Sequence, residues 1–554
     1  MQNYSVITKL QGFTARFENP RQVISLAGSN LEEAFARADA FARAGGYVIA
    51  LLNYELGEYL LLQGPPEEKL GTLLFYESFS RVVPRKSDSF AVTNLRMLQS
   101  RQSYAESLGL IFEELRAGNS YQVNYTSALE FDFFGEPEAL FSCMLERQPT
   151  PYNTIVRLDD EYIISASPEL FFEQKNTKLT CRPMKGTAPI EKGADFLSAD
   201  GKNRAENVMI VDLIRNDLNR ICDDVRVPAL LDVEEHKSLF QMTSTVTGTL
   251  RNTEPLNVIK ALFPCGSITG APKISTMKII RRLEAAPRGI YTGSIGFYHG
   301  SDSIHSIAIR TISLARGRGR MGIGGGITIS SGIEDEYDEM LLKAAFLTQN
   351  TGFAIFETLL WDASESLYKY FDEHLARLGD SARFFAIAFD RSVAEALLAG
   401  VAIAFTQSRR VRLSLNASGE LSVADFPLTQ WKDGPVLLKE VPRRPACFTR
   451  HKTTRRLNLP LADVCEYLLH TTDGELLEGS ISNLFLLIDG KWFTPPVSSG
   501  LLAGIERARF MDEVCAEEKR LYLTDLRRAK KIAFTNSVRG VHIIDNAAGK
   551  GTRK

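Results

Sequence analysis

The chain has 554 residues, of which 44% are hydrophobic and 24% are charged. This length exceeds what one hydrophobic core organises, so we expect at least two domains in a soluble globular protein. With 65 Lys plus Arg against 67 Asp plus Glu, the formal charge of −2 argues against a nucleic-acid binder or a polybasic membrane protein. No apolar stretch is long enough to span a membrane, and the scattered cysteines form no CxxC pair, so we expect a reducing, cytoplasmic location.

Residues 1–350 read as alternating helices and strands. The spacing of apolar residues predicts helices at 30–46, 101–118, 205–222, 271–284 and 335–347. Strands are expected at 47–53 and in the stretch 152–174, where apolar runs alternate with turn residues.

The pattern changes near residues 348–353, where we place a domain boundary between 1–350 and 351–554. A strand is expected at 353–362 and a helix at 371–386, followed by hairpins with turns at Asn416–Gly419, Asp473–Gly474 and Asp489–Gly490. Because both halves mix helix with sheet, the predicted fold class is α+β.

Three carboxylates in the first domain have the character of a metal site. Glu206 begins one predicted helix, and Glu336 and Glu339 lie at i and i+3 on one side of another. Oxygen-only ligation suits Mg²⁺. The alternative is that Glu339 pairs with Lys343 on a solvated helix face.

Further candidates come from three short segments. Consecutive glycines in GIGGGITISS (322–331) let backbone N–H groups approach an anion, unless they form a plain bulge. Arg310 follows an apolar strand and could bind a carboxylate, or could form a surface ion pair. Lys185, between Pro and Gly residues, is either a nucleophile or an exposed turn lysine.

Read together, these segments resemble one family. In order they are SPELFF (167–172), RPMKGTAP (182–189), RAENVMIVDLIRNDLNR (204–220), QMTSTVTGTL (241–250), GSITGAPK (266–273), YTGSIGF (291–297), IAIRT (307–311) and GIGGGI (322–327). They are similar to the chorismate-utilising enzymes, which include anthranilate synthase, aminodeoxychorismate synthase component I and isochorismate synthase. The resemblance implies a large two-layer β-sandwich with helices around it.

The resemblance also implies roles for individual residues. Glu206 and Glu339 would bind Mg²⁺, with Glu336 beside them, and the ion would hold the ring carboxylate of chorismate. Glu169 would be the general acid that helps the C4 hydroxyl leave. The enolpyruvyl carboxylate would be held, and the pocket lined, by Arg310, Tyr291, Thr269 and the backbone amides of Gly324, Gly325 and Gly326.

Lys185 distinguishes the members of this family. Where the motif reads Lys-Gly-Thr, the chain is similar to aminodeoxychorismate synthases, in which the lysine attacks C2 of the ring and ammonia then enters at C4. Anthranilate synthases carry Ala at this position and His where this chain has Gln241. Glutamine cannot exchange protons near neutral pH, which further disfavours the anthranilate interpretation.

The source of nitrogen is expected to lie outside the chain. No glutaminase segment is visible, so the partners would be chorismate and either free ammonia or a separate glutamine amidotransferase. Residues 1–90 are too divergent to read as a tryptophan-feedback site.

The second domain contains a possible cofactor site. A lysine and a carboxylate can hold pyridoxal 5'-phosphate, the lysine through a covalent bond and the carboxylate through the pyridine nitrogen. HKTTRR (451–456) precedes LLEGSISNLFLL (476–487), which makes Lys452 and Glu478 the candidates. The alternative is that Lys452 belongs to a basic surface run with Arg450, Arg455 and Arg456.

The order of segments supports the cofactor interpretation. FETLLWD (356–362), HLARLGDSARFF (374–385), HKTT, EGSISNLF, GLLAGIERARF (500–510) and FTNSVRGV (534–541) resemble the fold-type IV pyridoxal-phosphate enzymes. This resemblance implies a smaller α+β domain with Lys452 as the cofactor lysine and Glu478 as the pyridine-nitrogen partner. The phosphate would be bound by Arg377 and by donors at Ile505, Asn536 and Ser537.

Together the two resemblances predict p-aminobenzoate formation in the folate pathway. The first domain would make 4-amino-4-deoxychorismate, and the second would eliminate pyruvate from it. Three alternatives remain open: an anthranilate synthase, a second domain that is an aminotransferase, and a second domain that is only a degenerate scaffold.

Overall fold

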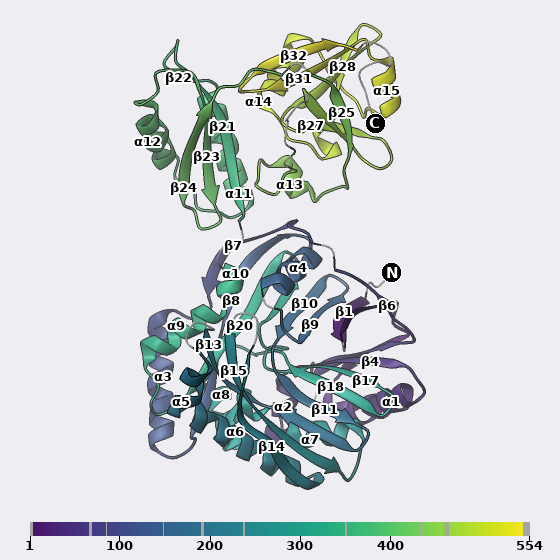
Figure 1. Ribbon diagram of the computed structural model, residues 1–554, viewed down its shortest axis with the longest axis vertical. Helices are drawn as coiled ribbons and strands as arrows, with labels where there is room; N and C mark the ends of the chain where they lie inside the picture. Colours follow the sequence, from purple (N-terminus) through teal and green to yellow (C-terminus); the bar gives the residue numbers. More distant parts are fainter. Residues whose placement is uncertain are drawn as a thin grey trace. The chain divides into compact units, whose positions relative to one another are not determined.

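A computed structural model describes residues 4–10, 12–65, 69–84, 86–147, 149–189, 193–235, 239–348, 352–432, 434–457, 459 and 465–546. The chain forms two compact units (Figure 1). Unit 1 comprises Met1–Ser87, Leu95–Phe131 and Phe141–Gln349, and unit 2 comprises Asp88–Asn94, Asp132–Leu140 and Asn350–Lys554. Both units mix helices and sheets, which confirms the α+β class. Residues 349–351 of the expected boundary lie outside the described residues.

Unit 1 contains two large sheets, and the first holds the glycine-rich strand. Its strands are β1 (Tyr4–Leu10), β2 (Phe13–Glu18), β6 (Ser80–Arg81), β7 (Phe90–Met97), β8 (Gln122–Gly135), β9 (Tyr152–Leu158), β10 (Glu161–Ser167), β16 (Gly270–Ala271), β19 (Thr311–Ala315) and β20 (Arg318–Ile327). They run in the order β16-β8-β20-β19-β10-β9-β1-β2-β6, and β7 pairs with β8. The sheet therefore brings β8 and β20 side by side.

The second sheet holds the strand of Lys185. Its strands are β3 (Gln22–Leu26), β4 (Tyr47–Leu52), β5 (Gly71–Tyr76), β11 (Leu170–Lys175), β12 (Lys178–Arg182), β13 (Met184–Pro189), β14 (Cys222–Glu235), β15 (Leu239–Leu250), β17 (Ser294–His299) and β18 (Asp302–Ile307). Their order is β13-β15-β12-β11-β18-β17-β4-β5-β3, with β14 pairing with β15.

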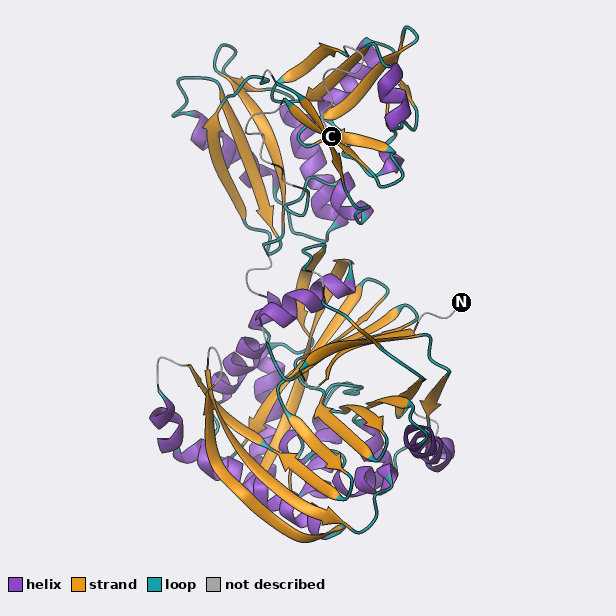
Figure 2. Ribbon diagram, turned by 45° about the vertical axis from the view of Figure 1, so that its right-hand side comes forward, coloured by secondary structure: helices purple, strands orange, loops and turns teal. Residues whose placement is uncertain are grey.

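Alternating side chains of β4 show how the layers of unit 1 are stacked. Val48 and Ala50 enter a core shared with the helices α1 (Leu31–Arg43), α2 (Glu55–Leu62), α6 (Gly201–Asn219) and α7 (Pro255–Leu262). Ile49 and Leu51 point the other way, into a core shared with Val6 of the first sheet. Because successive strand residues face opposite sides, the second sheet lies between a helical layer and the first sheet. Figure 2 shows these strands in orange and the helices in purple.

The remaining helices of unit 1 test the expected periodicity. They are α3 (Arg101–Arg116), α4 (Pro137–Arg147), α5 (Ala194–Ala199), α8 (Lys273–Leu283), α9 (Ile333–Lys343) and α10 (Ala345–Thr348). The helices expected at 101–118 and 271–284 are confirmed. The one expected at 205–222 already begins at Gly201 and stops before β14. The one expected at 335–347 is interrupted at Ala344, whose N–H bonds to the carbonyls of Leu341 and Leu342 and closes the last turn of α9.

Unit 2 has three smaller sheets. The first has the order β22-β21-β23-β24, the second β25-β26-β27 and the third β30-β29-β28-β31-β32. The strands are β21 (Ala354–Asp362), β22 (Leu367–Tyr368), β23 (Arg409–Asn416), β24 (Leu421–Pro427), β25 (Val436–Glu440), β26 (Glu466–His470), β27 (Leu476–Gly479), β28 (Asn483–Ile488), β29 (Lys491–Thr494), β30 (Glu517–Glu518), β31 (Lys531–Asn536) and β32 (Gly540–Asp545). The expected hairpins β23–β24, β26–β27 and β28–β29 are confirmed.

The helices of unit 2 are α11 (Phe371–Phe384), α12 (Arg391–Ala402), α13 (Ala446–Arg450), α14 (Ile505–Glu513) and α15 (Leu523–Arg528). One face of the first sheet packs on α11 and α12, through side chains such as Val411 and Leu413 of β23 and Leu375 of α11. The opposite face of that sheet carries Arg410 and Arg412 of β23 together with Phe356 of β21. Among the described residues, no helix combines the length and the apolar character that a bilayer span requires.

Two short segments from the first part of the sequence, which contain the start of β7, the end of β8 and the start of α4, belong to unit 2. Ala91 is buried in the core of its first sheet, with Phe448. The Thr93 hydroxyl donates a hydrogen bond to the Phe385 carbonyl at 2.6 Å, and Arg455 Nε donates to the Phe90 carbonyl at 3.0 Å. Unit 2 is therefore assembled from more than one stretch of chain, which the sequence did not predict.

Candidate active sites

Lys185 lies next to a carboxylate in unit 1. It comes from β13, and its side chain is 15% exposed. Its Nζ atom is 3.9 Å from Oε2 of Glu206, which α6 presents with a side-chain exposure of 14%. The two residues come from the separate motifs RPMKGTAP and RAENVMIVDLIRNDLNR, and the fold brings their side chains close together.

Glu169 completes this group as an acid. It is 5% exposed, and the Ser267 hydroxyl donates a hydrogen bond to its Oε1 at 2.9 Å. Burial raises the pKa of Glu169 to about 7, although nearby Lys185 and the bond from Ser267 act in the opposite direction. A carboxyl group with this pKa can still hold a proton near neutral pH and can donate it to a leaving group.

The segment around Thr269 approaches the same group. The turn η3 (Gly266–Ile268) carries Ser267, and Thr269 follows directly, its hydroxyl donating to the Cys265 carbonyl at 2.7 Å. Arg310 lies between β18 and β19 with a φ of +50°, and burial lowers the pKa of its guanidinium. The N–H of Thr292 donates to the Ala308 carbonyl at 2.9 Å, which places the Tyr291 segment beside that of Arg310.

Close packing accounts for two of the three glycines in β20. A Cβ atom on Gly324 would lie 2.4 Å from the Tyr125 carbonyl oxygen of β8, and one on Gly326 would lie 2.0 Å from Gln122 Nε2. Larger residues would therefore collide with the neighbouring strand. The strand pairing explains these two glycines without a ligand. The binding of a carboxylate by their backbone N–H groups stays a prediction.

Gln122 is a residue that the sequence did not single out. It is 1% exposed, and within the described ranges neither polar atom of its carboxamide has a hydrogen-bond partner. Leaving a buried amide unpaired costs free energy, so this side chain is suited to a ligand contact. No local signal in YQVNY marks it, because its importance depends on β20 lying alongside.

The three expected metal ligands do not come together. Glu336 accepts a hydrogen bond from the Ser331 hydroxyl at 2.7 Å, Glu339 pairs with Lys343 at 2.8 Å and is 56% exposed, and Glu206 lies beside Lys185. In the part of the chain that the structure describes, no three acidic, His or Cys side chains are close enough to hold a metal ion. The donor atoms suit Mg²⁺, but this arrangement is not a closed ligand set.

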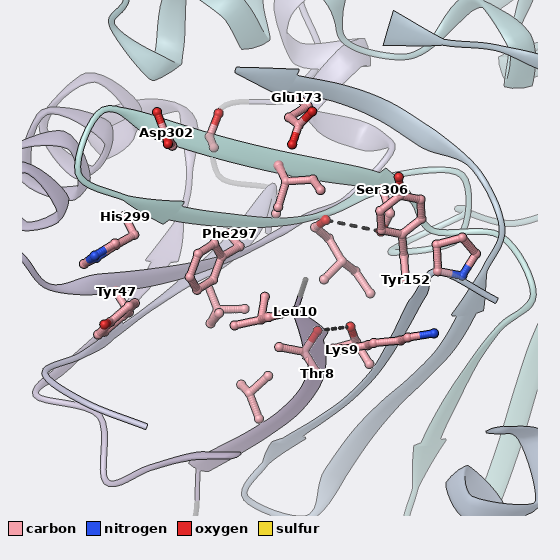
Figure 3. Close-up of a pocket in the computed structure, with 18 of the residues that line it drawn as sticks. Thr8, Lys9, Leu10, Tyr47, Tyr152, Glu173, Phe297, His299, Asp302 and Ser306 are labelled. Atoms are coloured by element: carbon pink, nitrogen blue, oxygen red, sulfur yellow. Dashed lines mark hydrogen bonds between the residues drawn. The ribbon is translucent and has the colours of Figure 1, made fainter. Parts of the chain in front are cut away.

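Unit 1 also contains a separate cavity of about 680 Å³, lined by strands of both sheets (Figure 3). Tyr47 and His299 stack in its wall with ring centroids 4.2 Å apart, and Glu173 and Asp302 add carboxylates. None of the predicted site residues lines it. This cavity is therefore distinct from the site of Lys185.

In unit 2, Lys452 lies beside β21. Its carbonyl accepts a hydrogen bond from the Phe356 N–H at 2.9 Å, and the next residue, Thr453, forms a bridge with Ile355. Burial lowers the pKa of Lys452 to about 8. The carboxylate of Glu357 acts in the opposite direction, and Arg377, Arg456 and Arg412 act in the same direction as burial. A lysine with this pKa has a substantial neutral fraction near pH 8 and can act as a nucleophile.

Arg377 is held rigidly by a carboxylate that the sequence did not identify. Its Nε and Nη2 atoms donate to the two oxygens of Glu357 at 2.8 and 2.7 Å, and Nη1 donates to the Ala503 carbonyl at 2.9 Å. His374 Nδ1 lies 2.7 Å from Glu357 Oε2. Burial disfavours the charged form of Glu357, but Arg377 and His374 hold its pKa below the usual range. One N–H group on each terminal nitrogen of Arg377 is not used by these partners.

Glu478 is a buried carboxylate on β27, 6% exposed. Arg456 forms an ion pair with it, and the Leu502 N–H donates to its Oε2 at 3.3 Å. Burial raises the pKa of Glu478, which Arg456 partly counteracts. Asn483 donates to the Leu502 carbonyl at 2.8 Å, so Glu478 is joined to the segment that leads into α14.

The remaining expected phosphate ligands occupy two places. Ile505 is the first residue of α14 and lies two residues after Ala503, whose carbonyl Arg377 contacts, so Arg377 lies near a helix N-terminus. Asn536 ends β31, and its Oδ1 accepts hydrogen bonds from the N–H groups of Val538 and Arg539. Ser537 lies in the same turn. Within the described ranges, no hydrogen bond links that turn to Arg377.

This donor set fits pyridoxal phosphate chemically. Lys452 supplies an amine with a lowered pKa, and Glu478 supplies a buried carboxylate. Arg377 supplies N–H groups beside the N-terminus of α14, where the helix dipole favours an anion.

Two family models match successive parts of the chain. Residues 81–349 match the family model described as chorismate binding enzyme, and residues 354–547 match that of amino-transferase class IV. Aminodeoxychorismate synthase component 1 of Escherichia coli (strain K12) is 36% identical over 255 residues, which cover 44% of this chain and 56% of that protein. Anthranilate synthase component 1 of Saccharolobus solfataricus is 35% identical over 253 residues, covering 43% and 60%.

A solved structure supports the fold of unit 1. Anthranilate synthase component I from Streptococcus pneumoniae is 23% identical, with a TM-score of 0.55, and the match covers 63% of this chain and 92% of that one. The chain spans between 29% and 60% of the length of the curated relatives that it matches. The chain therefore carries a domain of the chorismate binding enzyme family followed by a domain of the class IV aminotransferase family.

Proposed function

We propose that the chain makes p-aminobenzoate from chorismate in two steps. Unit 1 converts chorismate and ammonia to 4-amino-4-deoxychorismate, and unit 2 eliminates pyruvate from that product. The observation that carries the proposal is Lys185 beside Glu206 and Glu169 in a family whose matched relative in Escherichia coli is named aminodeoxychorismate synthase component 1. Ammonia comes from solution or from a partner glutamine amidotransferase.

In the first step, Lys185 acts on the ring of chorismate. Its amine forms a bond to C2, the ring double bonds shift, and the C4–O bond breaks. Glu169, whose pKa is about 7, donates its proton to the departing hydroxyl, which leaves as water. Ammonia then bonds to C4, and the electron pair of the C2–N bond returns to Lys185. Because the lysine occupies C2, the incoming nitrogen is directed to C4.

In the second step, Lys452 serves as the covalent anchor and then as the base. Pyridoxal phosphate, when bound, supplies an electron sink for the carbanion that forms at C4. Glu478 would keep the pyridine nitrogen protonated, and Arg377 with the N-terminus of α14 would hold the phosphate. Lys452, once released, removes the C4 proton, and protonation of the enolpyruvyl methylene allows pyruvate to depart.

Mg²⁺ is the metal that we propose for the first step, with Glu206, Glu336 and Glu339 as ligands by resemblance. Because Glu339 is paired with Lys343 and the three carboxylates are not gathered, we assign no step to the ion. Titrating the chorismate reaction with Mg²⁺ tests the assignment. A Glu206→Gln variant that stays active with an unchanged Mg²⁺ requirement would contradict it.

The alternatives make different demands on single residues. An anthranilate synthase would have Ala in place of Lys185. A degenerate scaffold would not need an amine with a lowered pKa at Lys452, which favours an active second domain. An aminotransferase shares Lys452 and Glu478 and is separated from a lyase only by its products.

All seven cysteines are free thiols, which supports a reducing, cytoplasmic setting.

The decisive experiment supplies purified protein with chorismate, Mg²⁺, ammonium and pyridoxal phosphate, and no other enzyme. We expect p-aminobenzoate and pyruvate in equal amounts by chromatography. Anthranilate as the product would reject the first step, and accumulation of 4-amino-4-deoxychorismate without pyruvate would reject the second. Lys185→Met and Lys452→Met should each be inactive alone, and a mixture of the two should restore p-aminobenzoate because each supplies the step that the other lacks.

A further inference from the structure

Arg288 is a buried arginine in the loop between α8 and β17, and its guanidinium is fully hydrogen-bonded. Only 2% of its side chain is exposed. Its Nε and Nη2 atoms donate to the two carboxylate oxygens of Glu284 at 2.8 and 2.7 Å. Nη1 donates to the Ile268 carbonyl at 3.0 Å and to the Thr292 hydroxyl at 3.2 Å, and Nη2 donates to the Asn124 carbonyl at 2.7 Å. These five bonds use every N–H group of the guanidinium.

Two of these acceptors are neighbours of residues that we expect in the chorismate pocket. Ile268 directly precedes Thr269, and Thr292 directly follows Tyr291. The Thr292 hydroxyl extends the contact to Tyr291, because it accepts from Arg288 and donates to the Tyr291 carbonyl at 2.6 Å. Arg288 therefore links two segments that lie before and after α8 in the sequence.

The third acceptor, the Asn124 carbonyl, belongs to β8. Glu284 reinforces this link, because its Oε1 also accepts from the N–H and the hydroxyl of Thr126 on the same strand, each at 2.9 Å. Gln122, whose carboxamide has no hydrogen-bond partner among the described residues, lies two residues before Asn124 on the same face of β8. The ion pair of Arg288 and Glu284 is thus attached to the strand that carries Gln122.

Thr292 is held in a backbone conformation that its side chain disfavours. Its φ of +59° lies in the left-handed region, which is unusual for a β-branched residue. Such a conformation persists where the surrounding structure fixes the residue from several sides. The N–H of Thr292 donates to the Ala308 carbonyl at 2.9 Å, and its hydroxyl lies between Arg288 and the Tyr291 carbonyl. Arg288 therefore helps to hold the turn that follows Tyr291.

The loop of Arg288 is itself anchored to α2. Arg288 Cζ lies 4.3 Å from the centroid of the Tyr54 ring. The N–H of Tyr54 donates to the Gly289 carbonyl at 2.8 Å, and the N–H of Gly289 donates to Oε1 of Glu55 at 3.0 Å. The guanidinium is therefore attached to the helical layer as well as to the pocket segments.

We propose that Arg288 is a positioning residue for the chorismate site of unit 1. It holds Thr269 and Tyr291 in the relative positions that the substrate requires, and Thr292 carries its effect to Tyr291. The inference rests on the proposed function and deepens it by naming what sets the geometry of the substrate contacts. Because protein acceptors use all of its N–H groups, Arg288 acts through its neighbours and does not itself bind the substrate.

The first test removes the Thr292 hydroxyl and keeps the shape of the side chain. Initial rates of chorismate consumption are measured on the full chain loaded with pyridoxal phosphate, with Mg²⁺ and ammonium. Thr292→Val should raise KM for chorismate by about tenfold, because a buried cationic N–H loses its acceptor. KM for ammonium should not change. Thr292→Ser keeps the hydroxyl and should restore most of the loss.

Thr8→Val is the matched control for Thr292→Val. The buried Thr8 hydroxyl shares a hydrogen bond with that of Thr154 at 2.7 Å, in the separate cavity of unit 1. The control loses a buried hydroxyl in the same unit, so its thermal unfolding midpoint should fall about as far as that of Thr292→Val. Because its site is distant, its KM for chorismate should stay within about twofold of wild type.

The second test changes Arg288 itself. Arg288→Lys keeps a positive charge opposite Glu284 but supplies three donors in place of five. We expect KM for chorismate to rise by about 10- to 100-fold, because small displacements of binding groups have effects of this size, with a smaller change in kcat. Pyruvate release from 4-amino-4-deoxychorismate by unit 2 of the same preparation should equal that of wild type.

The outcomes distinguish this inference from the proposed function. An unchanged KM for chorismate in Thr292→Val overturns the positioning role and leaves the function intact, even if Arg288→Lys yields no soluble protein. A rise in KM that Thr8→Val matches also overturns it, because the loss of any buried hydroxyl would then suffice.

A wild-type chain that makes neither 4-amino-4-deoxychorismate nor p-aminobenzoate overturns the proposed function instead. Equilibrium dialysis of chorismate with Mg²⁺ and without ammonium then decides the positioning role. Weaker binding in Thr292→Val but not in Thr8→Val supports it, and equal binding in the two variants overturns it.

Discussion

The two candidate sites differ in the side chains that lie around their lysines. Lys185 in unit 1 has the carboxylates of Glu206 and Glu169 beside it. Lys452 in unit 2 is buried, which lowers its pKa to about 8; it has three arginines around it as well as the carboxylate of Glu357, which acts in the opposite direction. The difference follows the proposed chemistry. The first site must protonate a departing hydroxyl, which Glu169 can do. The second site must bind anionic groups, which its arginines can do.

The largest effect is expected from Lys452→Met. It removes both the covalent anchor and the base, so pyruvate release from 4-amino-4-deoxychorismate should fall by roughly 10²–10⁴-fold or more. The visible absorbance of the bound cofactor should disappear, whereas the step of unit 1 should continue. Lys491→Met is the matched control, because Lys491 is 69% exposed. Pyruvate release that survives the change would reject the role of Lys452.

Lys185→Met tests the other lysine. Without the amine that blocks C2, formation of 4-amino-4-deoxychorismate should fall by roughly 10²-fold or more, and some anthranilate should appear. Chromatography of the products of chorismate and ammonium measures both. Lys278→Met on α8 serves as the control. An unchanged yield of p-aminobenzoate would mean that no covalent bond to Lys185 is needed.

The acid in the first site predicts a pH dependence. Burial raises the pKa of Glu169 to about 7, so the proton needed by the leaving hydroxyl is present below that pH and is lost above it. The rate of the first step should fall by about tenfold per pH unit above this value. Glu169→Gln should lower the rate by about 10²-fold and remove that limb of the profile. A profile that is flat between pH 6 and 8, by stopped assays in wild type, would contradict the assignment.

A smaller effect should follow from loosening Arg377. Glu357→Gln removes the charge that holds its guanidinium beside α14. We expect pyridoxal phosphate to bind about tenfold more weakly, which corresponds to ~1.4 kcal/mol. Equilibrium dialysis measures this constant. Glu395→Gln, which changes an exposed pair with Arg391 on α12, is the control and should leave the affinity unchanged. Equal affinities in the two variants would show that Arg377 does not need Glu357.

Much of the fold could be predicted because its signals are local. Helical spacing identified α3 and α8, and the turn residues at Asn416–Gly419 and Asp489–Gly490 identified hairpins of unit 2. The groups around Lys185 and Lys452 could be proposed because ordered motifs carry them. Local patterns fail at Ala344, where the hydrogen bonding of one helical turn interrupts a continuous apolar spacing.

The residues missed by the sequence depend on pairing between distant segments. Glu357 reads as one position of a strand, and only the approach of α11 makes it the partner of Arg377 and His374. Gln122 gains its position from β20, and Arg288 gains its acceptors from β8 and from segments before and after α8. No spacing within one motif reports such contacts.

The segments Asp88–Asn94 and Asp132–Leu140 have a practical consequence for experiments that separate the two units. The family match for the second domain starts at residue 354, which suggests a gene fragment beginning there. Such a fragment would lack Ala91 from its core and the partners of the Phe385 carbonyl and of Arg455 Nε. Expressed alone, it would expose apolar surface and be prone to aggregate. The two proposed activities are thus better separated by point substitutions than by cutting the gene.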